Sequence, residues 1–298
     1  MKWHQALTDY KHYLRLERGL ADNSIKNYSL DINKLIRWLE ENKVDVQPLN
    51  IDKEVLQKFV YEIAKSVNAR SQARIISGIK GFFNYLVYED YRLDNPTDLI
   101  ESPKLGRKLP DTLSEGEINL LIAAIDLSQP QGERNRAILE TLYGCGLRVS
   151  ELLDLKLSDL FFNEGYILVT GKGNKQRFVP IAAYTKKIIN IYKDEIRVHQ
   201  KAKPDFQDTL FLNRRGARLT RAMIFTIIKD LAEKAEIKKN ISPHTFRHSF
   251  ATHLLTNGAD LRAIQQMLGH ESITTTEVYM HLDRSHLAEV MDKFHPRK

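Results

Sequence analysis

Cysteine is almost absent from the chain, because Cys145 is the only one among 298 residues. An internal disulfide is therefore excluded, and we expect Cys145 to be a small packing residue, with a reactive thiol as the alternative. No apolar run approaches the ~20 residues that span a membrane. The first five residues contain no apolar signal region. Together these absences predict a cytoplasmic protein without a membrane partner.

Acidic residues are outnumbered by basic ones, with 38 Asp and Glu against 45 Lys and Arg, so the net charge is +7 and the pI is about 9.2. A basic balance favours a polyanionic partner such as nucleic acid. The charge alone is weak support, because many basic proteins bind no nucleic acid. The length and the hydrophobic content of 42% predict two globular domains with ample core.

The first hundred residues predict a small four-helix domain. Apolar residues recur there at three- and four-residue steps. An opening helix stops at Gly19, a second follows the caps Asp22 and Asn23, a third covers roughly 52–64 and a fourth roughly 69–87. The predicted inward residues are Leu7, Tyr10, Leu14, Ile25, Tyr28, Ile32, Leu35, Leu39, Val55, Phe59, Ile63, Ile75, Ile79, Phe82 and Leu86.

Three cations lie off the apolar stripe of the fourth predicted helix, namely Arg70, Arg74 and Lys80, and this segment contains no acid. For any one of them, a solvated face is the better interpretation. Taken together, they predict contact with DNA phosphates.

Residues 101–111 predict a basic linker between an N-terminal domain (1–100) and a second domain (112–298). Two prolines and a glycine oppose regular structure. Lys104, Arg107 and Lys108 would suit a segment lying along a sugar–phosphate backbone. Fully extended, this linker reaches roughly 36 Å, several times the ~12 Å width of a major groove. The two domains could therefore grip opposite sides of a duplex.

For the second domain, the sequence predicts mainly helices with a small antiparallel sheet. Ser114 and Glu117 fit a capping box. A helix over about 133–143 breaks at a Gly-Cys-Gly run, and another begins near Arg148. Segments 166–170 and 177–181 have the pattern of strands around a turn at 171–174. Helices dominate the remainder.

Six residues carry the side chains that metal-free attack on a phosphodiester needs: Arg148, Lys172, His244, Arg247, His270 and Tyr279. As nucleophile, Tyr279 would attack phosphorus and keep the energy of the broken bond as a phosphotyrosine. A free phenol has a pKa near ~10, so its activation depends on nearby cations and a proton acceptor. Taken alone, a tyrosine between aliphatic residues is more often a core residue.

His244 and Arg247 follow a Ser-Pro pair that predicts a helix start, and their i, i+3 spacing puts both on one face. Arg247 would bind two non-bridging phosphate oxygens as a planar fork. His244 would donate to the phosphate or take the tyrosine proton. A surface pair on a basic protein is an alternative of about equal weight.

Arg148 follows a glycine-rich break at a predicted helix start, where the helix N-terminus favours an anion. There it could share a phosphate with Arg247. The alternative is a salt bridge to Glu151. We give it less weight, because the glycine-rich break suggests close approach by a ligand.

Lys172 occupies the predicted hairpin tip, where a mobile ammonium could enter the DNA and protonate the leaving 5′-oxygen. Lys175 and Arg177 would assist docking on DNA. His270 ends a predicted helix, whose C-terminus stabilises a cationic histidine, and could reach the phosphate from the side opposite His244. A solubilising lysine and a capping histidine are the respective alternatives.

Two other motifs, a zinc-binding helix and a nucleotide-binding loop, do not fit the sequence. His244 and His248 have the spacing of a zinc helix, but Thr245 stands where a metalloprotease has glutamate, and Arg247 would repel a cation. The Gly-Lys-Gly run at 171–173 lacks the upstream glycine of a nucleotide loop. We therefore expect no metal and no cofactor.

Four segments together resemble the tyrosine recombinase (lambda-integrase-like) family: residues 143–152, 171–175, 244–253 and 267–272. All six active-site residue types stand where the motifs of that family put them. Within the family the chain is similar to the Xer subfamily, nearer to its XerD type than to its XerC type. The helical domain begins at once, and the run 257–262 and the closing 295–297 fit Xer proteins.

This resemblance implies a two-domain C-shaped clamp around double-stranded DNA, built from an N-terminal four-helix bundle and a C-terminal catalytic domain. It implies a 3′-phosphotyrosine at Tyr279, a free 5′-hydroxyl and a Holliday junction, without metal or ATP in the chemistry. In the cell it implies resolution of chromosome dimers at a dif-type site during segregation and division. The implied partners are a sister Xer recombinase, in a heterotetramer on two sites, and the septal DNA translocase FtsK.

The last helical segment is amphipathic, with Leu287, Val290, Met291 and Phe294 on one side. Analogy with the family implies that it docks on the neighbouring protomer, and packing on its own domain is the alternative. Three other functions stay open: a mobile-element integrase, a type IB topoisomerase-like relaxing enzyme, and a DNA-binding architectural protein without chemistry.

Overall fold

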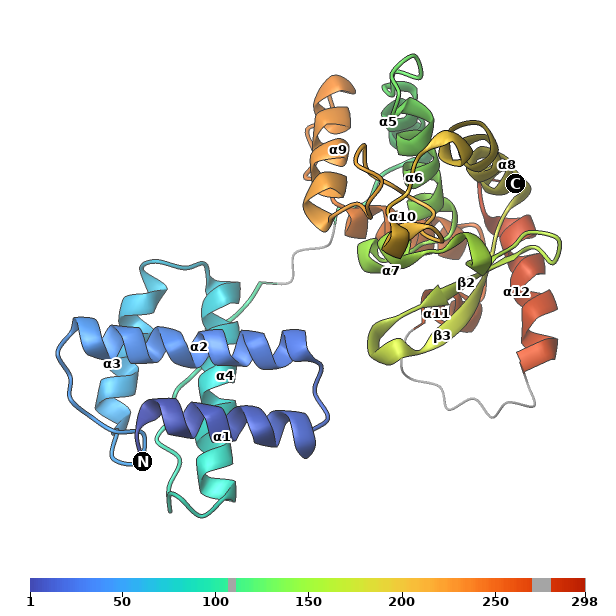
Figure 1. The fold of residues 1–298 in the computed structure, drawn as a ribbon. Helices are drawn as coiled ribbons and strands as arrows, with labels where there is room; N and C mark the ends of the chain where they lie inside the picture. Colours follow the sequence, from blue (N-terminus) through green and yellow to red (C-terminus); the bar gives the residue numbers. More distant parts are fainter. Residues whose placement is uncertain (107–110, 270–279, 298) are drawn as a thin grey trace. The chain divides into compact units, whose positions relative to one another are not determined.

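The computed structural model describes residues 1–106, 111–269 and 280–297. The chain divides into two compact units, Met1–Lys108 and Leu109–Lys298 (Figure 1). This division falls inside the segment predicted as a linker. Each unit has a hydrophobic core of its own.

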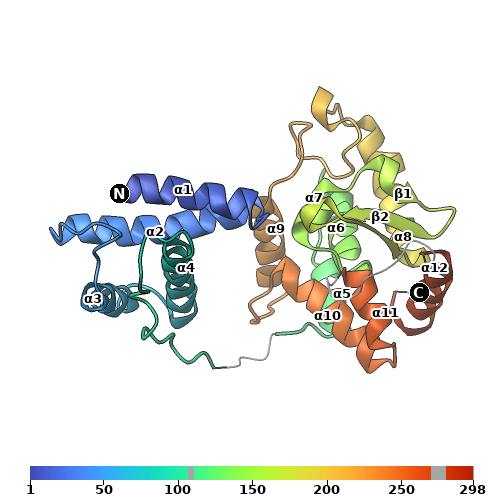
Figure 2. The same ribbon diagram turned by 90° about the horizontal axis from the view of Figure 1, so that it is seen from below.

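Four helices build the first unit: α1 (Trp3–Leu16), α2 (Asp22–Glu41), α3 (Lys53–Ala64) and α4 (Ala69–Tyr88). Helices α1 and α2 lie side by side, and α3 and α4 cross them (Figures 1 and 2). Their apolar stripes meet in one core, which contains most of the predicted inward residues. Tyr28, Val55 and Ile63 lie at its edge and are only partly buried. The predicted four-helix domain is confirmed.

Side-chain caps begin two of these helices. Asp52 and Asn68 each accept a hydrogen bond from the backbone N–H three residues on, at 2.8 and 2.9 Å. The predicted cap of α2 is wrong, because Asp22 is already the first helical residue. Its carboxylate lies 2.6 Å from the guanidinium of Arg15 at the end of α1. The acid therefore links two helices.

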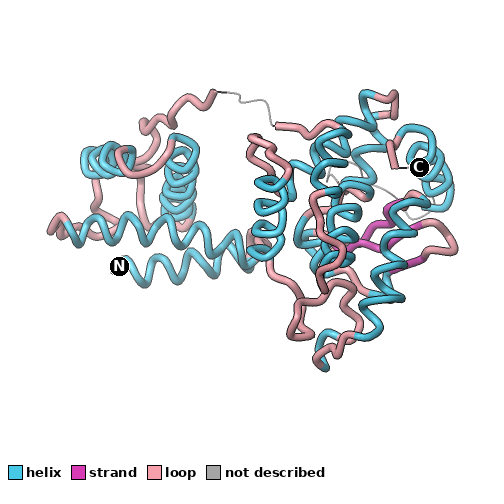
Figure 3. Tube along the Cα trace, turned by 90° about the horizontal axis from the view of Figure 1, so that it is seen from above, coloured by secondary structure: helices cyan, strands magenta, loops and turns pink. Residues whose placement is uncertain are grey.

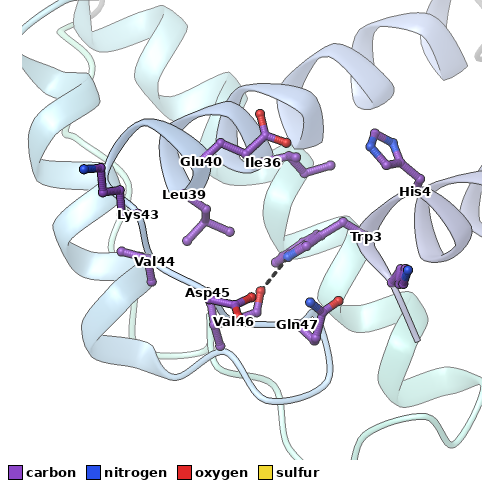
Figure 4. Close-up of a pocket in the computed structure, with 11 residues that line it drawn as sticks. Trp3, His4, Ile36, Leu39, Glu40, Lys43, Val44, Asp45, Val46 and Gln47 are labelled. Atoms are coloured by element: carbon purple, nitrogen blue, oxygen red, sulfur yellow. Dashed lines mark hydrogen bonds between the residues drawn. The ribbon is translucent and has the colours of Figure 1, made fainter.

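A surface pocket of about 480 Å³ lies where the start of α1 meets the end of α2 and the following loop (Figure 4). Trp3 forms one wall, and its indole Nε1 donates to the carbonyl of Val46 at 2.8 Å. Among the described residues that line it, none belongs to the predicted active site. All six predicted catalytic residues belong to the second unit.

The second unit is mainly α-helical and contains a small three-stranded antiparallel sheet (Figure 3). Its longer elements are α5 (Glu115–Ala123), α6 (Gly132–Gly144), α7 (Val149–Asp154), β1 (Leu160–Phe161), β2 (Tyr166–Thr170), β3 (Gln176–Pro180), α8 (Ala183–Ile191), α9 (Arg221–Lys234), α10 (Pro243–Thr256), α11 (Leu261–Leu268) and α12 (Met280–Phe294). Short 3₁₀ or π turns are η1 (Leu157–Asp159), η2 (Lys172–Asn174), η3 (Tyr192–Ile196), η4 (Arg197–His199) and η5 (Pro204–Phe206). The predicted fold class, mainly α with a small antiparallel sheet, is confirmed.

The hairpin of β2 and β3 matches the predicted strand pair. Its register runs from Tyr166 opposite Pro180 to Thr170 opposite Gln176, and η2 forms the tip. Strand β1 was not predicted, because two residues are too few to show alternation. The predicted capping box is present at α5, where Ser114 and Glu117 bond each other's backbone N–H.

Gly146 joins α6 to α7 in a left-handed conformation, with φ at +59°. A Cβ at this position would lie 2.5 Å from the ring of Phe250. Gly146→Ala should therefore destabilise the second unit by about 3 kcal/mol, from backbone strain and overpacking together. Urea unfolding followed by far-UV circular dichroism measures this loss.

Gly165→Ala is a matched control, because Gly165 also has a positive φ, at +77°, but no described residue other than its chain neighbours lies within 4 Å of its would-be Cβ. It should cost about 1 kcal/mol from strain alone. Trp3 and Trp38 both lie in the first unit, so their fluorescence transition should not move in either variant. Equal destabilisation by the two substitutions would contradict the close contact with Phe250.

Candidate active site

The structure brings two predicted phosphate ligands, Arg148 and Arg247, to one buried carboxylate. A terminal guanidinium nitrogen (Nη1) of Arg148 lies 2.7 Å from Glu151 Oε1, and that of Arg247 lies 3.8 Å from Glu151 Oε2. Both guanidiniums also donate to the carbonyl of Leu268, at 3.4 and 2.6 Å. Segments far apart in the sequence thus place two fixed positive charges in one site.

Arg148 is the N-cap of α7, with an extended backbone, as the predicted helix start requires. Its own N–H donates to Glu151 Oε2 at 2.9 Å. The salt bridge to Glu151, to which the sequence analysis gave less weight, is present, and the phosphate role of Arg148 stays a prediction. The pairing leaves 38% of the Arg148 side chain exposed. An anion can therefore still approach this guanidinium.

Arg247 lies on α10 and is only 4% exposed. Its guanidinium donates to the carbonyl of Gly146 at 2.9 Å as well as to that of Leu268. Burial, and then the nearby charge of Arg148, lower the pKa of Arg247 to about 10. That pKa is still well above neutral, so the side chain remains a cation at neutral pH.

Glu151 is a member of this site that the sequence interpretation left out. It is only 3% exposed. Burial raises its pKa, but hydrogen bonds and charge from Arg177 and Arg148 outweigh burial, and the net shift is downward. A signal was present in the sequence: this acid stands one helical turn after an arginine and directly before two leucines.

Arg177 also turns towards Glu151. Two of its guanidinium nitrogens donate to the two carboxylate oxygens at 2.9 Å each. Its side chain is 14% exposed. With Arg148 and Arg247, three guanidiniums surround one carboxylate, which leaves a net charge of +2. This excess favours a phosphate at the open side.

His244 is exposed and lies one turn before Arg247 on α10. The predicted helix start is confirmed, with Ser242 as N-cap and Pro243 as the first helical residue. The N–H of Ser242 donates to Thr245 Oγ1 at 3.1 Å. The exposed His244 and the buried Arg247 therefore lie one helical turn apart on α10.

The remaining predicted catalytic residues are less fully placed. Lys172 begins η2 at the hairpin tip, but its side chain lies outside what the structure describes. His270 and Tyr279 lie wholly outside the described residues, as do Arg107 and Lys108 of the linker. Their roles stay predictions.

Among the cations predicted to contact DNA, Arg70, Lys104 and Lys175 are exposed and Lys80 is half-buried. Arg74 lies 2.5 Å from Asp31, whose side chain is almost fully buried. The sequence of α4 contains no acid, and the fold supplies one from α2. Arg74 is therefore partly neutralised, while its side chain stays half exposed.

The C-terminal segment packs on its own unit. Leu287, Val290 and Met291 are buried in that unit's core, with Phe294 against it, as the own-domain alternative stated. Arg297 Nε donates to Glu140 Oε2 at 3.0 Å. Docking on a neighbouring protomer stays a prediction.

Cys145 is fully buried, and burial raises the pKa of its thiol to about 12, so the predicted packing role is confirmed. Within the described residues, no group of three or more His, Cys, Asp or Glu side chains is placed to hold a metal ion. The described helices include none long and apolar enough to cross a membrane.

Both units, the helical N-terminal one and the one in which the two arginines meet, match family models. Residues 111–286 match the phage integrase family, and residues 7–90 match the phage integrase N-terminal SAM-like domain. The chain belongs to the phage integrase family of tyrosine recombinases, and it is a site-specific DNA recombinase.

Its relatives include tyrosine recombinase XerD of Staphylococcus saprophyticus, which is 42% identical over 292 residues and 98% of both chains. XerD of Oceanobacillus iheyensis is 40% identical over 293 residues, also 98% of both. A solved XerH recombinase bound to its difH substrate is 25% identical, with a TM-score of 0.68 over 91% of this chain and 77% of that one. A lambda integrase dimer on a core site shares the fold. It is 19% identical, with a TM-score of 0.72 over 93% of this chain and 100% of that one. The predicted Xer resemblance is confirmed.

Proposed function

We propose that the chain cuts and rejoins DNA through a 3′-phosphotyrosine at Tyr279, with Arg148 and Arg247 clamping the phosphate. The observation that carries this proposal is the convergence of the two guanidiniums on Glu151 and on the Leu268 carbonyl. Fixed positive charge stabilises the pentacoordinate phosphorane without a metal ion. The structure holds these cations in place before DNA arrives, so little reorganisation is needed during the reaction.

The cleavage step exchanges one bond to phosphorus for another. The phenolic oxygen of Tyr279 forms a bond to phosphorus, and the bond from phosphorus to the 5′-oxygen breaks. His244 takes the phenol proton, and Lys172 protonates the leaving oxygen. His270 donates to a non-bridging oxygen. Attack by the 5′-hydroxyl of another strand reverses these transfers and completes the exchange.

We further propose that the DNA is a dif-type site and that the reaction resolves chromosome dimers during segregation and division. Two XerD relatives at 40% and 42% identity over nearly the whole chain support this, as does the likeness to an XerH bound to difH. The proposed partners are a sister Xer recombinase in a heterotetramer and the translocase FtsK, in the cytoplasm. The proposed backbone contacts are Arg70, Arg74, Lys80, Lys104, Arg107, Lys108 and Lys175.

Supercoiled plasmids test this function, with two dif-type sites in one plasmid and none in its control. In the presence of EDTA and the sister recombinase, we expect recombinant products from the first plasmid alone. Relaxation of both plasmids at the same rate would instead indicate a type IB topoisomerase-like enzyme. Normal DNA binding with no strand breakage in any plasmid would indicate an architectural protein.

A further inference from the structure

Arg177, on one arm of the hairpin, uses all three of its guanidinium nitrogens in hydrogen bonds. Nη1 and Nη2 each lie 2.9 Å from a different oxygen of Glu151, a planar fork on a carboxylate. Nε donates to the carbonyl of Met267 at 2.8 Å. A Cβ on Gly269 would lie 3.0 Å from Arg177 Cδ, so the chain packs closely here.

These contacts join three segments that each carry a proposed catalytic residue. Arg177 itself lies on β3, the strand that follows the tip with Lys172. Its partner Glu151 lies on α7, one turn after Arg148, and its partner Met267 lies on α11, three residues before His270. One guanidinium therefore links the hairpin, the start of α7 and the end of α11.

Within the part of the chain that the structure describes, the fork supplies half of the hydrogen bonds to Glu151. The carboxylate there accepts four bonds, two from Arg177 and two from the side chain and backbone N–H of Arg148. Four bonds match the number of lone-pair sites that a carboxylate offers. Without Arg177, a buried carboxylate would lose its main counter-charge and compete with the DNA for Arg148 and Arg247.

We propose that Arg177 is a positioning residue: it neutralises and orients Glu151 and ties the three segments together, so that Arg148 and Arg247 face the scissile phosphate. It does not contact DNA. This role depends on the proposed function, and it differs from the docking role that the sequence suggested for Arg177. The strand register also places Arg177 on the buried face of the hairpin. Arg177 stands opposite the buried Val169 and two residues before the buried Val179.

The salt dependence of DNA affinity distinguishes a positioning role for Arg177 from direct contact with a DNA phosphate. A cation that contacts a phosphate adds about 0.9 to the slope of log affinity against log salt. Because Arg177 contacts no phosphate in this proposal, Arg177→Met should leave the slope nearly unchanged. It should weaken the affinity for a dif-type duplex by less than about threefold, since affinity is distributed over many phosphate contacts. At saturating DNA, the single-turnover rate constant for adduct formation should fall by about 100-fold, as expected for misplaced reacting groups.

Arg177→Lys and a double variant sharpen the test. Lysine keeps the charge but cannot form the fork, so it should not restore the rate. If Arg177 acts through Glu151, then Arg177→Met should slow Glu151→Gln little further. Thermal unfolding of each variant identifies loss of fold, which lowers the amplitude of the adduct burst and leaves its rate constant unchanged.

Two results would overturn the inference: a salt slope that falls by about one in Arg177→Met and recovers in Arg177→Lys, or a reduced burst amplitude with an unchanged rate constant. The first makes Arg177 a DNA contact, and the second leaves it a purely structural residue. Failure of the wild-type protein to form any adduct is a different outcome, because it counts against the proposed function itself.

Discussion

Tyr279→Phe should form no covalent adduct with DNA while it binds a dif-type duplex as tightly as the wild type does. Phenylalanine keeps the ring but lacks the oxygen that attacks phosphorus. A duplex nicked next to the cleavage position measures this, because the short fragment diffuses away after cleavage and traps the protein on the DNA. The adduct is counted on a denaturing gel, and the linked peptide is identified by mass spectrometry.

Tyr88→Phe is a matched control, since Tyr88 lies at the end of α4 in the first unit and its side chain is largely exposed. It should form the adduct at the wild-type rate. An adduct of equal yield in Tyr279→Phe, or a linked peptide that does not contain residue 279, would remove Tyr279 as the nucleophile and with it the proposed reaction.

Local structure follows directly from the sequence in this protein. The apolar stripes predicted the four helices of the first unit, and the strand pattern around 171–174 predicted the hairpin. Such periodicity reports which face of an element is buried. It does not report what covers that face. For this reason the amphipathic end of the chain left open whether Leu287 and Met291 pack on their own unit, as they do here, or on another protomer.

The candidate site shows the same limit. Sequence motifs marked Arg148 and Arg247 separately, but only the tertiary fold shows that both reach Glu151. For Arg177, charge suggested a surface role, whereas strand alternation would have grouped it with the buried Val179. A cation beside a turn can either contact DNA or pair with a buried acid of its own chain. The position of its counter-ion decides between these two roles.

Arg247→Ala should slow adduct formation far more than it weakens DNA binding. Affinity is distributed over many phosphate contacts, so we expect the dissociation constant to rise less than 10-fold. Charge that develops in the transition state depends on a few fixed donors, and the loss of one costs about 10²–10³-fold in rate. Single-turnover cleavage at saturating DNA, with binding measured by fluorescence anisotropy, separates the two effects.

Arg247→Lys distinguishes charge from geometry. Its ammonium is a point charge and cannot replace both hydrogen bonds that the buried guanidinium makes to the carbonyls of Gly146 and Leu268. We therefore expect a rate between those of Arg247→Ala and the wild type. Each variant is assayed well below its unfolding temperature, because an unpaired buried carbonyl also costs stability. Equal losses in binding and in cleavage would reduce Arg247 to a docking residue and leave the phosphorane without its most buried cation.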